Sequence, residues 1–280
     1  MSKQEQRRAL RAINQIKLKR CGKVKGRTCA NGSVQRGYIF KEDSSLQTIS
    51  LNALFTTWII NSIEGWKVQT FDVPGAYLHA EIPEDERVFM KFEKEFVDIM
   101  CEVNPEYKEH VRIKNGRKVL YVQVLKVICG MIESTLRWYK LFTGTLCGMG
   151  FELNPYDCCV ANKMIEGSQC TVGWYVDDNK VSHVNDDMNT MIIDAIEEKF
   201  GKLARTTGNK HTFLGMDVEM ISRGKIAVST PQHVDKAIKG LGEEVNGTAV
   251  NPAKRKLFYI DTKSPKLTGD KEEFIPLCHS

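Results

Sequence analysis

The arrangement of apolar and polar positions predicts a protein that combines strands with helices. Apolar residues alternate with other residues along 171–176 and return in residues 181–184, which is the period of a β-strand. Between the two runs stand Asp177, Asp178 and Asn179, and all three are turn-forming residues. We therefore expect residues 171–184 to form a β-hairpin that carries two adjacent acids at its tip.

Two further stretches place apolar residues three or four positions apart, as one face of a helix requires. The first covers residues 131–149 and is followed by Gly150, a residue that commonly ends a helix. The second covers residues 188–200 and follows Asp186 and Asp187, whose charges suit the N-terminus of a helix. Both stripes are interpreted as faces that pack into a core.

The remaining regular segments complete an alternating plan. Residues 66–72 read as a strand, residues 159–161 begin another, and residues 211–219 with 224–229 indicate a second hairpin. In chain order the elements are strand, helix, hairpin, helix, hairpin. This order is typical of an α+β fold in which helices pack on one face of an antiparallel sheet.

The other segments have weaker patterns. We expect strands near residues 24–40 and a helix around residues 46–62. Residues 84–118 are charged and poorly patterned, and they are interpreted as an insertion. From residue 240 onward Gly, Pro, Lys and Asp dominate, so an ordered structure is not expected throughout that segment.

The net charge of +5 hides an uneven distribution. Residues 1–36 contain eleven Lys or Arg and only one acid, Glu5, while the remainder contains 29 basic and 34 acidic residues. A basic segment on an acidic body suits contact with phosphates. The alternative is a solvated basic helix or a disordered tail, and we favour that alternative for residues 1–16.

Composition excludes several classes of protein. With 280 residues and 42% hydrophobic content, the chain is expected to form one or two globular domains. It has no apolar run near the roughly 18 residues of a membrane-spanning helix, and Met1 to Arg11 lack the apolar core of a secretory signal. Nine cysteines without a Cys-x-x-Cys pair predict reduced thiols and no zinc site. We therefore expect an intracellular protein, in the cytoplasm or nucleus, without a membrane partner.

The acids carry the candidate chemistry. Asp177 and Asp178 alone are explained equally well as a solvated hairpin tip. Asp72 changes this balance, because it ends a predicted strand and is followed by the turn residues Pro74 and Gly75. A strand-end acid beside an acidic hairpin tip can hold two divalent cations, and hard carboxylate oxygens suit Mg²⁺.

Five motifs, in this order, resemble those of the reverse transcriptase of copia-type retrotransposons. They are residues 25–30 (a basic fingers motif), 71–78 (the first catalytic motif), 125–131 with 137–139 (a template-gripping segment), 175–178 (the second catalytic motif) and 213–216 (a primer-grip hairpin). The resemblance extends from about residue 17 to about residue 239. It implies a right-hand polymerase palm-and-fingers fold and RNA-directed DNA polymerase activity, within a pol polyprotein.

The resemblance also implies a division of the chain and a set of partners. Its parts are a basic N-terminal segment (1–16), fingers (17–65), a palm (66–230, with the insertion 84–118) and a remnant of a thumb or connection that is partly disordered (231–280). The partners are an RNA or DNA template with its primer, deoxynucleoside triphosphates and other parts of a retroelement polyprotein.

The residue roles that follow from the resemblance are these. The catalytic and metal-binding residues are Asp72, Asp177 and Asp178, which hold two Mg²⁺ ions, or Mn²⁺ in their place. The nucleotide-binding residues are Lys25, Arg27, Val73, Ala76, Tyr77 and Gly130, and the primer grip consists of Phe213, Leu214, Gly215 and Met216. Tyr77 is expected to close over the sugar, with a packed core tyrosine as the alternative. Gly130 is expected to let the backbone approach the templating base pair, and residues 213–216 have an ordinary hairpin as their alternative.

One segment departs from the common pattern of this family. After Gly130, the usual Lys-Gln-Ala-Pro-Arg is replaced by residues 132–136, Ile-Glu-Ser-Thr-Leu, which removes two positive charges and adds a negative one. Two functions therefore remain open. The chain is either an active polymerase, which the three acids favour, or a catalytically silent relic that only binds nucleic acid. A third class, another two-metal nucleotidyltransferase, explains the acids but not the order of the motifs.

Overall fold

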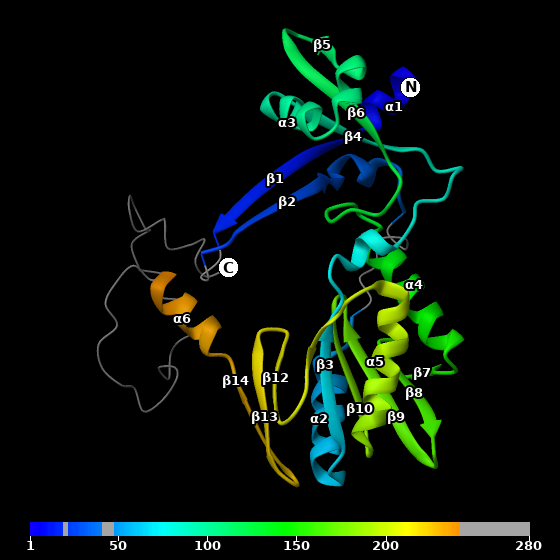
Figure 1. Ribbon diagram of the computed structural model, residues 1–280, viewed down its shortest axis with the longest axis vertical. Coiled ribbons are helices and arrows are strands. Elements are labelled where there is room, and N and C mark those ends of the chain that lie inside the picture. The colour runs from blue at the N-terminus through cyan, green and yellow to red at the C-terminus, as the bar shows by residue number, and fades with distance from the viewer. Residues whose placement is uncertain (19–21, 41–47, 241–280) are drawn as a thin grey trace, which may run out of the picture.

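The computed structural model describes residues 1–18, 22–40 and 48–240 (Figure 1). The strands of these ranges form one five-stranded, one six-stranded and one three-stranded sheet. Helices pack beside the two larger sheets, so the expected α+β fold is confirmed. Figure 1 shows the five-stranded sheet at the top, the six-stranded sheet below it, and the three-stranded sheet at the side.

The six-stranded sheet is antiparallel throughout, in the order β11-β3-β10-β9-β8-β7. Its strands are β3 (Lys67–Asp72), β7 (Glu152–Leu153), β8 (Val160–Ile165), β9 (Ser168–Tyr175), β10 (Asp178–His183) and β11 (Ala204–Thr206). The predicted strand at 66–72 and the predicted hairpin at 171–184 are both present. They are adjacent in the sheet, because β10 pairs with both β3 and β9.

Both predicted helical stripes form helices on one face of this sheet. They are α4 (Ser134–Gly148) and α5 (Asp186–Phe200). Aromatic rings fill the space between the helices and the strands: Trp138 and Phe142 stack with centroids 5.3 Å apart, and Phe142 meets Trp174 of β9 edge-on at 5.4 Å. Such ring pairs add packing energy beyond the apolar area they bury.

The helix expected around residues 46–62 is α2 (Leu51–Glu64), and it covers part of the opposite face. The expectation that the helices pack on one face only is therefore wrong. Adjacent residues of a strand point to opposite faces. Trp174 accordingly meets α4, while a Cβ on Gly173 would lie 3.1 Å from Ile49, just before α2. The helix begins at Leu51, later than the expected residue 46, because the Ser50 side chain caps it by accepting a hydrogen bond from the Ala53 amide. Gly65 ends it with φ 75°.

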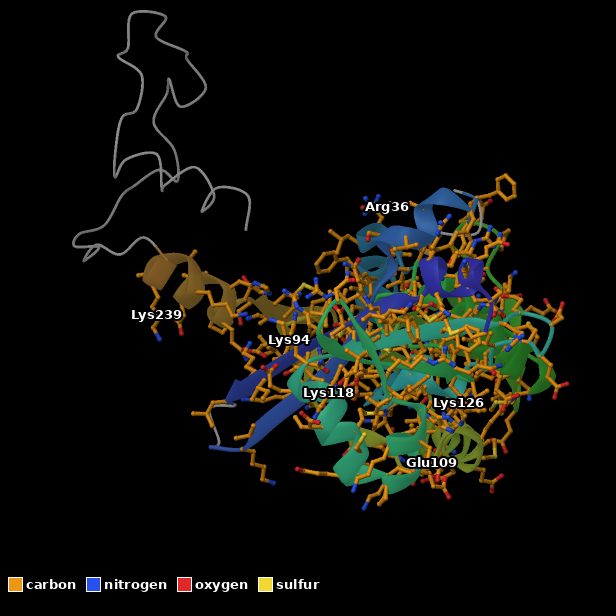
Figure 2. All side chains as sticks on the ribbon, turned by 90° about the horizontal axis from the view of Figure 1, so that it is seen from above. Arg36, Lys94, Glu109, Lys118, Lys126 and Lys239 are labelled. Atoms are coloured by element: carbon orange, nitrogen blue, oxygen red, sulfur yellow. The ribbon has the colours of Figure 1, made fainter. Side chains whose placement is uncertain are left out.

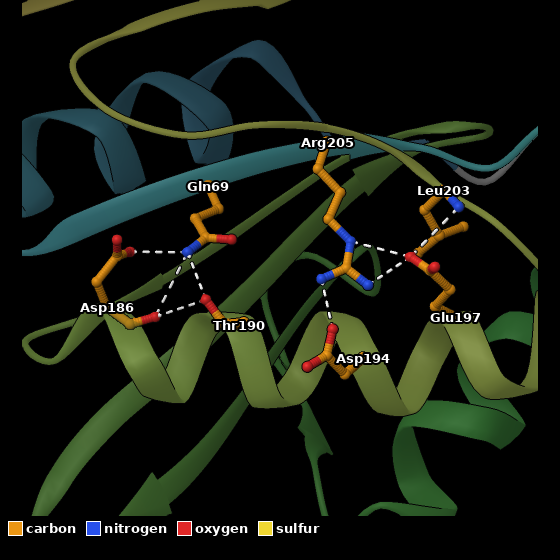
Figure 3. A network of polar contacts seen from close by, with 7 residues as sticks. All are labelled: Gln69, Asp186, Thr190, Asp194, Glu197, Leu203 and Arg205. Carbon is orange, nitrogen blue, oxygen red and sulfur yellow. Dashed lines mark hydrogen bonds and ion pairs between the residues drawn. The ribbon is translucent and has the colours of Figure 1, made fainter.

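Polar contacts fasten α5 to the sheet (Figure 3). The Gln69 amide of β3 donates to the Asp186 carboxylate at 3.0 Å and to the Thr190 hydroxyl at 2.9 Å. At the other end of the helix, the Arg205 guanidinium of β11 donates from Nε to the Glu197 carboxylate at 3.0 Å. Helix α5 is therefore held to β3 directly through Gln69, and to β11, the strand that pairs with β3 at Asp72, through Arg205.

The five-stranded sheet has the order β2-β1-β4-β6-β5. Its elements are α1 (Lys3–Arg8), β1 (Leu10–Leu18), β2 (Val24–Asn31), the 3-10 helix η1 (Gly32–Gly37), β4 (Val88–Glu93), α3 (Glu95–Val103), the 3-10 helix η4 (Pro105–His110), β5 (Arg112–Lys114) and β6 (Arg117–Val124). This sheet and α3 share a second core, separate from that of the six-stranded sheet.

Two sequence predictions fail in this region. Residues 1–16 are not a disordered tail or only a basic helix: β1 pairs with β2 and β4, and Leu10 is fully buried. Residues 84–118 are not an unpatterned insertion, because β4 lies at the centre of the sheet. Its charged residues Lys91 and Glu93 pair with each other at 2.7 Å on the face opposite the buried Met90, which disguises a regular strand alternation.

The predictions at both ends of the chain also need correction. Of the strands expected near residues 24–40, the described residues contain β2, which ends at Asn31, where η1 begins. The stretch 211–219 folds into two strands, β12 (Lys210–Phe213) and β13 (Met216–Ser222), which pair with each other. Strand β13 also pairs with β14 (Lys225–Ser229). The chain then enters α6 (Pro231–Gly240), and Figure 2 shows Lys239 at the outer end of this helix. The expectation for residues beyond 240 lies outside the described ranges.

Candidate active site

The three acids lie at the same end of neighbouring strands. Asp72 is the last residue of β3 and Asp178 the first of β10, and the two are direct partners in the antiparallel register. Partners in such a ladder have Cα atoms about 4.5–5.5 Å apart. Asp177 precedes Asp178 in the turn, and its carbonyl accepts a hydrogen bond from the Val73 amide at 3.1 Å. The sheet thus brings the three sequence-predicted acids together.

The turn that presents these acids has an unusual backbone. Val176 adopts φ 57°, a left-handed conformation that a β-branched residue rarely takes. The Trp138 indole donates to the Val176 carbonyl at 2.7 Å, and the Asn179 amide donates to the Asp177 carbonyl at 2.5 Å. These contacts hold a strained turn in place, and strain of this kind costs roughly 1–3 kcal/mol and is concentrated at functional sites.

Ionisation of all three carboxylates is unfavourable without a positive charge beside them. Burial raises the pKa of Asp72, and the neighbouring Asp177 carboxylate raises it further, while Lys25 lowers it. Burial also raises the pKa of Asp178, with further contributions from Asp177 and Asp72. A cation between these groups would relieve this repulsion.

The described residues contain no group of three or more His, Cys, Asp or Glu side chains already arranged to hold a metal ion. The donor set itself fits Mg²⁺, because three carboxylates from two adjacent segments supply hard oxygen ligands.

A cavity of about 470 Å³ lies against Asp177 and separates it from the five-stranded sheet. Arg27 of β2 lines this cavity, and so does the segment around Ile128. Lys25, on the same strand, is exposed and near enough to act on Asp72 through its charge. Two predicted basic residues therefore face the acids across the cavity, as phosphate binding would require.

The turn after Asp72 supplies the other walls of the cavity. Val73 is fully buried, and Gly75, with φ 65°, leads into the 3-10 helix η3 (Ala76–His79). Ala76 and Tyr77 both line the cavity. The Tyr77 hydroxyl lies 3.3 Å from the Thr135 hydroxyl, and burial raises the pKa of this tyrosine. Tyr77 packs against both cores, so it combines a structural position with access to the cavity.

The structure explains why position 130 is a glycine, through a backbone contact that the sequence does not reveal. Its φ is 94°, and a Cβ added there would lie 2.1 Å from the Ala30 carbonyl oxygen. The Ala30 amide also donates to the Cys129 carbonyl at 2.8 Å. Close contact with β2 therefore requires glycine at this position, independently of any template.

The predicted primer-grip residues also reach the acids. Phe213 and Met216 are paired at the ends of β12 and β13, and Leu214 and Gly215 form the turn between them. Both turn residues have positive φ, 52° and 73°. The Leu214 amide donates to the Asp178 carboxylate at 3.4 Å, which joins this hairpin to the acidic turn.

Sequence reasoning missed two residues near the acids. Trp138 was read only as part of a core stripe, yet its indole holds the acidic turn. Lys180 lies on β10, is fully buried, and has no hydrogen-bond partner for its ammonium within the described residues. Its Nζ lies 4.9 Å from the centroid of the Trp58 ring, and burial lowers its pKa to about 7. The sequence offered one signal for Lys180: a lysine within a predicted strand of otherwise mostly uncharged residues.

An antiparallel sheet with three acids at one end, helices behind it and a basic sheet across a cavity is the arrangement of a nucleic-acid polymerase. The sequence profile described as "Reverse transcriptase (RNA-dependent DNA polymerase)" matches residues 6–254. The chain belongs to this family, and its relatives place it with the copia-type reverse transcriptases.

Those relatives are transposon polyproteins of Saccharomyces cerevisiae. The chain is 24% identical over 279 residues to the Transposon Ty1-MR1 Gag-Pol polyprotein, covering 93% of this chain and 14% of that protein. It is 23% identical over 288 residues to the Transposon Ty1-DR4 Gag-Pol polyprotein, covering 96% of this chain and 16% of that protein. The chain therefore spans only a small part of the length of these relatives.

Two solved structures also resemble it. Apo telomerase from Candida tropicalis, truncated from its C-terminal domain, has a TM-score of 0.36 and 12% identity, covering 78% of this chain and 55% of that one. Telomerase from Candida albicans, in complex with a TWJ fragment of telomeric RNA, has a TM-score of 0.39 and 10% identity, covering 82% and 48%.

Proposed function

We propose that the chain catalyses RNA-directed DNA synthesis as the polymerase domain of a copia-type retrotransposon polyprotein. The observation that carries this proposal is the pairing of Asp72 with Asp178, beside Asp177, at the edge of a cavity that Arg27 also lines. The template and primer would be nucleic acid, and the substrates deoxynucleoside triphosphates. We place the protein inside the cell, as the sequence predicts, and none of its described helices is long and apolar enough to cross a membrane.

The proposed division of labour follows the two sides of the cavity. Asp72, Asp177 and Asp178 would hold two Mg²⁺ ions, which supply activation of the primer hydroxyl and neutralisation of the triphosphate. The Val73 carbonyl would add an oxygen ligand. Lys25 and Arg27 would contact the triphosphate from the other side, since guanidinium and ammonium groups both bind phosphates.

The remaining predicted residues would orient the substrates. Tyr77 would lie against the sugar, because it is held at the cavity wall next to Ala76. Phe213, Leu214, Gly215 and Met216 would place the primer end, which their contact with Asp178 supports. Gly130 would lie near the templating base pair.

Primer extension on a homopolymer RNA template with Mg²⁺ tests the proposal, using the full chain. Asp177→Asn should reduce extension at least about 100-fold, because a ligand that neutralises charge in the transition state is lost. Binding of the primer–template should persist, since Asp177 is exposed and supports no buried contact through its side chain. Asp187→Asn is the matched control: it removes the same charge from an exposed position at the start of α5 and should extend like the parent.

The outcomes separate the two functions left open by the sequence. Equal extension by the parent and Asp177→Asn rejects Asp177 as a ligand. A parent chain that binds the primer–template but never extends it rejects the proposed activity and favours the catalytically silent relic.

A further inference from the structure

Two cysteines lie side by side at the cavity, and neither belongs to the catalytic machinery proposed above. Cys29 is on β2, and Cys129 follows β6. The hydrogen bond from the Ala30 amide to the Cys129 carbonyl, at 2.8 Å, brings the backbones of the two segments into direct contact. Disulfides span Cα distances of about 4.4–6.8 Å, a range that directly hydrogen-bonded backbone segments can supply.

The two side chains also face the same space. Both line the cavity of about 470 Å³, together with Arg27, Tyr77 and Asp177. Partial burial raises the pKa of the Cys129 thiol, and the neighbouring Cys29 thiol raises it further. The two thiols therefore lie near enough to interact.

Access distinguishes this pair from most other thiols in the described ranges. Cys129 is exposed and Cys29 is half-buried, whereas Cys101, Cys159 and Cys170 are buried. Cys147 is exposed on α4 and serves below as a control. A small oxidant that enters the cavity thus meets two adjacent thiols at once.

We propose that Cys29 and Cys129 form a redox-active dithiol site, which a two-electron oxidant of the peroxide class converts into an intrachain disulfide. One thiolate attacks a peroxide oxygen, the O–O bond breaks, and the sulfur becomes a sulfenic acid as the other oxygen leaves as water. The second thiol attacks this sulfur, the S–S bond forms, and the sulfenic oxygen leaves as a second water molecule. A dithiol reductant returns both thiols by exchange.

The functional consequence rests on the proposed polymerase activity. The new bond would join β2 to the segment that leads into Gly130, and so fix two walls of the cavity in which the nucleotide is proposed to bind. It would also place a disulfide on the cavity wall that Arg27 and Tyr77 help to form. Oxidised chain is therefore expected to extend primers at least about 10-fold more slowly than reduced chain, and a dithiol reductant is expected to restore the rate.

The bond itself is tested without any activity measurement. The full chain is treated with hydrogen peroxide, remaining thiols are alkylated, and the protein is cleaved after Lys and Arg. Cleavage yields peptides 28–36 and 127–137, each of which contains one cysteine. Mass spectrometry should find these two peptides joined after oxidation and separate after reduction. Cys29→Ser should remove the joined product, and Cys147→Ser should leave it unchanged.

The contrary results are equally specific. Recovery of both peptides in alkylated form after oxidation, or a link from Cys29 to any cysteine other than Cys129, overturns the dithiol site.

Primer extension is then measured in the same samples, with Cys129→Ser as the variant expected to resist oxidation. If the chain forms the bond but is inactive when reduced, the polymerase proposal is refuted and the dithiol site stands. If the chain is active but forms no bond, the dithiol site is refuted and the polymerase proposal stands. If an active chain forms the bond without losing rate, the proposed effect of the disulfide on the cavity is refuted.

Discussion

The two large sheets of this protein are stabilised in different ways. The core of the five-stranded sheet consists of nonpolar side chains such as Leu10, Met90 and Leu120. In the six-stranded sheet, β10 buries Asn179, Lys180, Ser182 and His183 in succession around the single apolar residue Val181.

The cause of this difference is coverage on both faces. The six-stranded sheet has α4 and α5 on one side and α2 on the other, so polar residues of β10 have no route to solvent. Most of them are hydrogen-bonded: the Ser182 hydroxyl donates to the Thr171 carbonyl at 3.4 Å, and His183 lies 3.3 Å from the Ile165 carbonyl. The comparison teaches that the sheet carrying the acids adds buried polar contacts to its apolar core, whereas the core of the five-stranded sheet depends on apolar burial.

The largest effect is expected from Trp138, which joins packing to a polar contact. Trp138→Ala should lower the free energy of unfolding by about 3–5 kcal/mol, because a large buried ring is lost. Trp138→Phe retains most of the packing and removes the hydrogen bond to the Val176 carbonyl, so it should cost about 1–3 kcal/mol. Urea unfolding measures both values. Hydrogen exchange at residues 175–178 should accelerate in both variants.

Leu120→Ala is the matching change in the five-stranded sheet. It should cost about 2–5 kcal/mol through the cavity it leaves, without altering exchange at residues 175–178. Equal acceleration of exchange at the acidic turn in the Leu120 variant would contradict the separation of the two cores.

The second prediction concerns the buried ammonium of Lys180. An unpartnered charge inside a protein is costly, and replacement of buried charges by apolar groups of similar volume often stabilises by about 1–4 kcal/mol. Lys180→Met should therefore raise the free energy of unfolding at neutral pH by that amount. The control is Lys163→Met, which removes a donor that bonds to the Met149 carbonyl at 2.6 Å and should lower stability by about 1 kcal/mol. A loss of stability in Lys180→Met would show that this ammonium has a stabilising role.

The same comparison explains what the sequence could predict. The helices α4 and α5 and the acidic hairpin follow from local periodicity, and Asp72 was placed beside Asp178 by recognising a strand end and a turn. The five-stranded sheet was missed because one of its pairings joins distant segments: Leu10 of β1 pairs in parallel with Met90 of β4. The pattern of apolar residues within a segment does not identify a partner strand that is distant in sequence. The contact of Trp138 with the acidic turn and the meeting of Cys29 with Cys129 were missed for the same reason.

The smallest expected effect is a pH dependence from a histidine that packs against the six-stranded sheet. His211 of β12 is buried against Trp58, with ring centroids 5.6 Å apart, and it lies 3.2 Å from the Thr70 hydroxyl. Burial lowers the pKa of His211; the Gly208 carbonyl raises it, and the charge of Lys180 lowers it further.

Because its pKa is lower in the folded chain, protonation of His211 favours the unfolded state. The stability it contributes is complete above the unfolded pKa of about 6.5 and is lost as the pH falls through the lower, folded value. Between about pH 7.5 and pH 5.5, the parent should therefore lose up to roughly 1 kcal/mol more stability than His211→Gln, which cannot titrate. Carboxylates such as Asp72 titrate alike in both proteins and cancel in the difference. His110→Gln, at an exposed position, should follow the parent. Parallel pH profiles for the parent and His211→Gln would show that burial of this histidine against Thr70 and Trp58 does not make stability depend on pH.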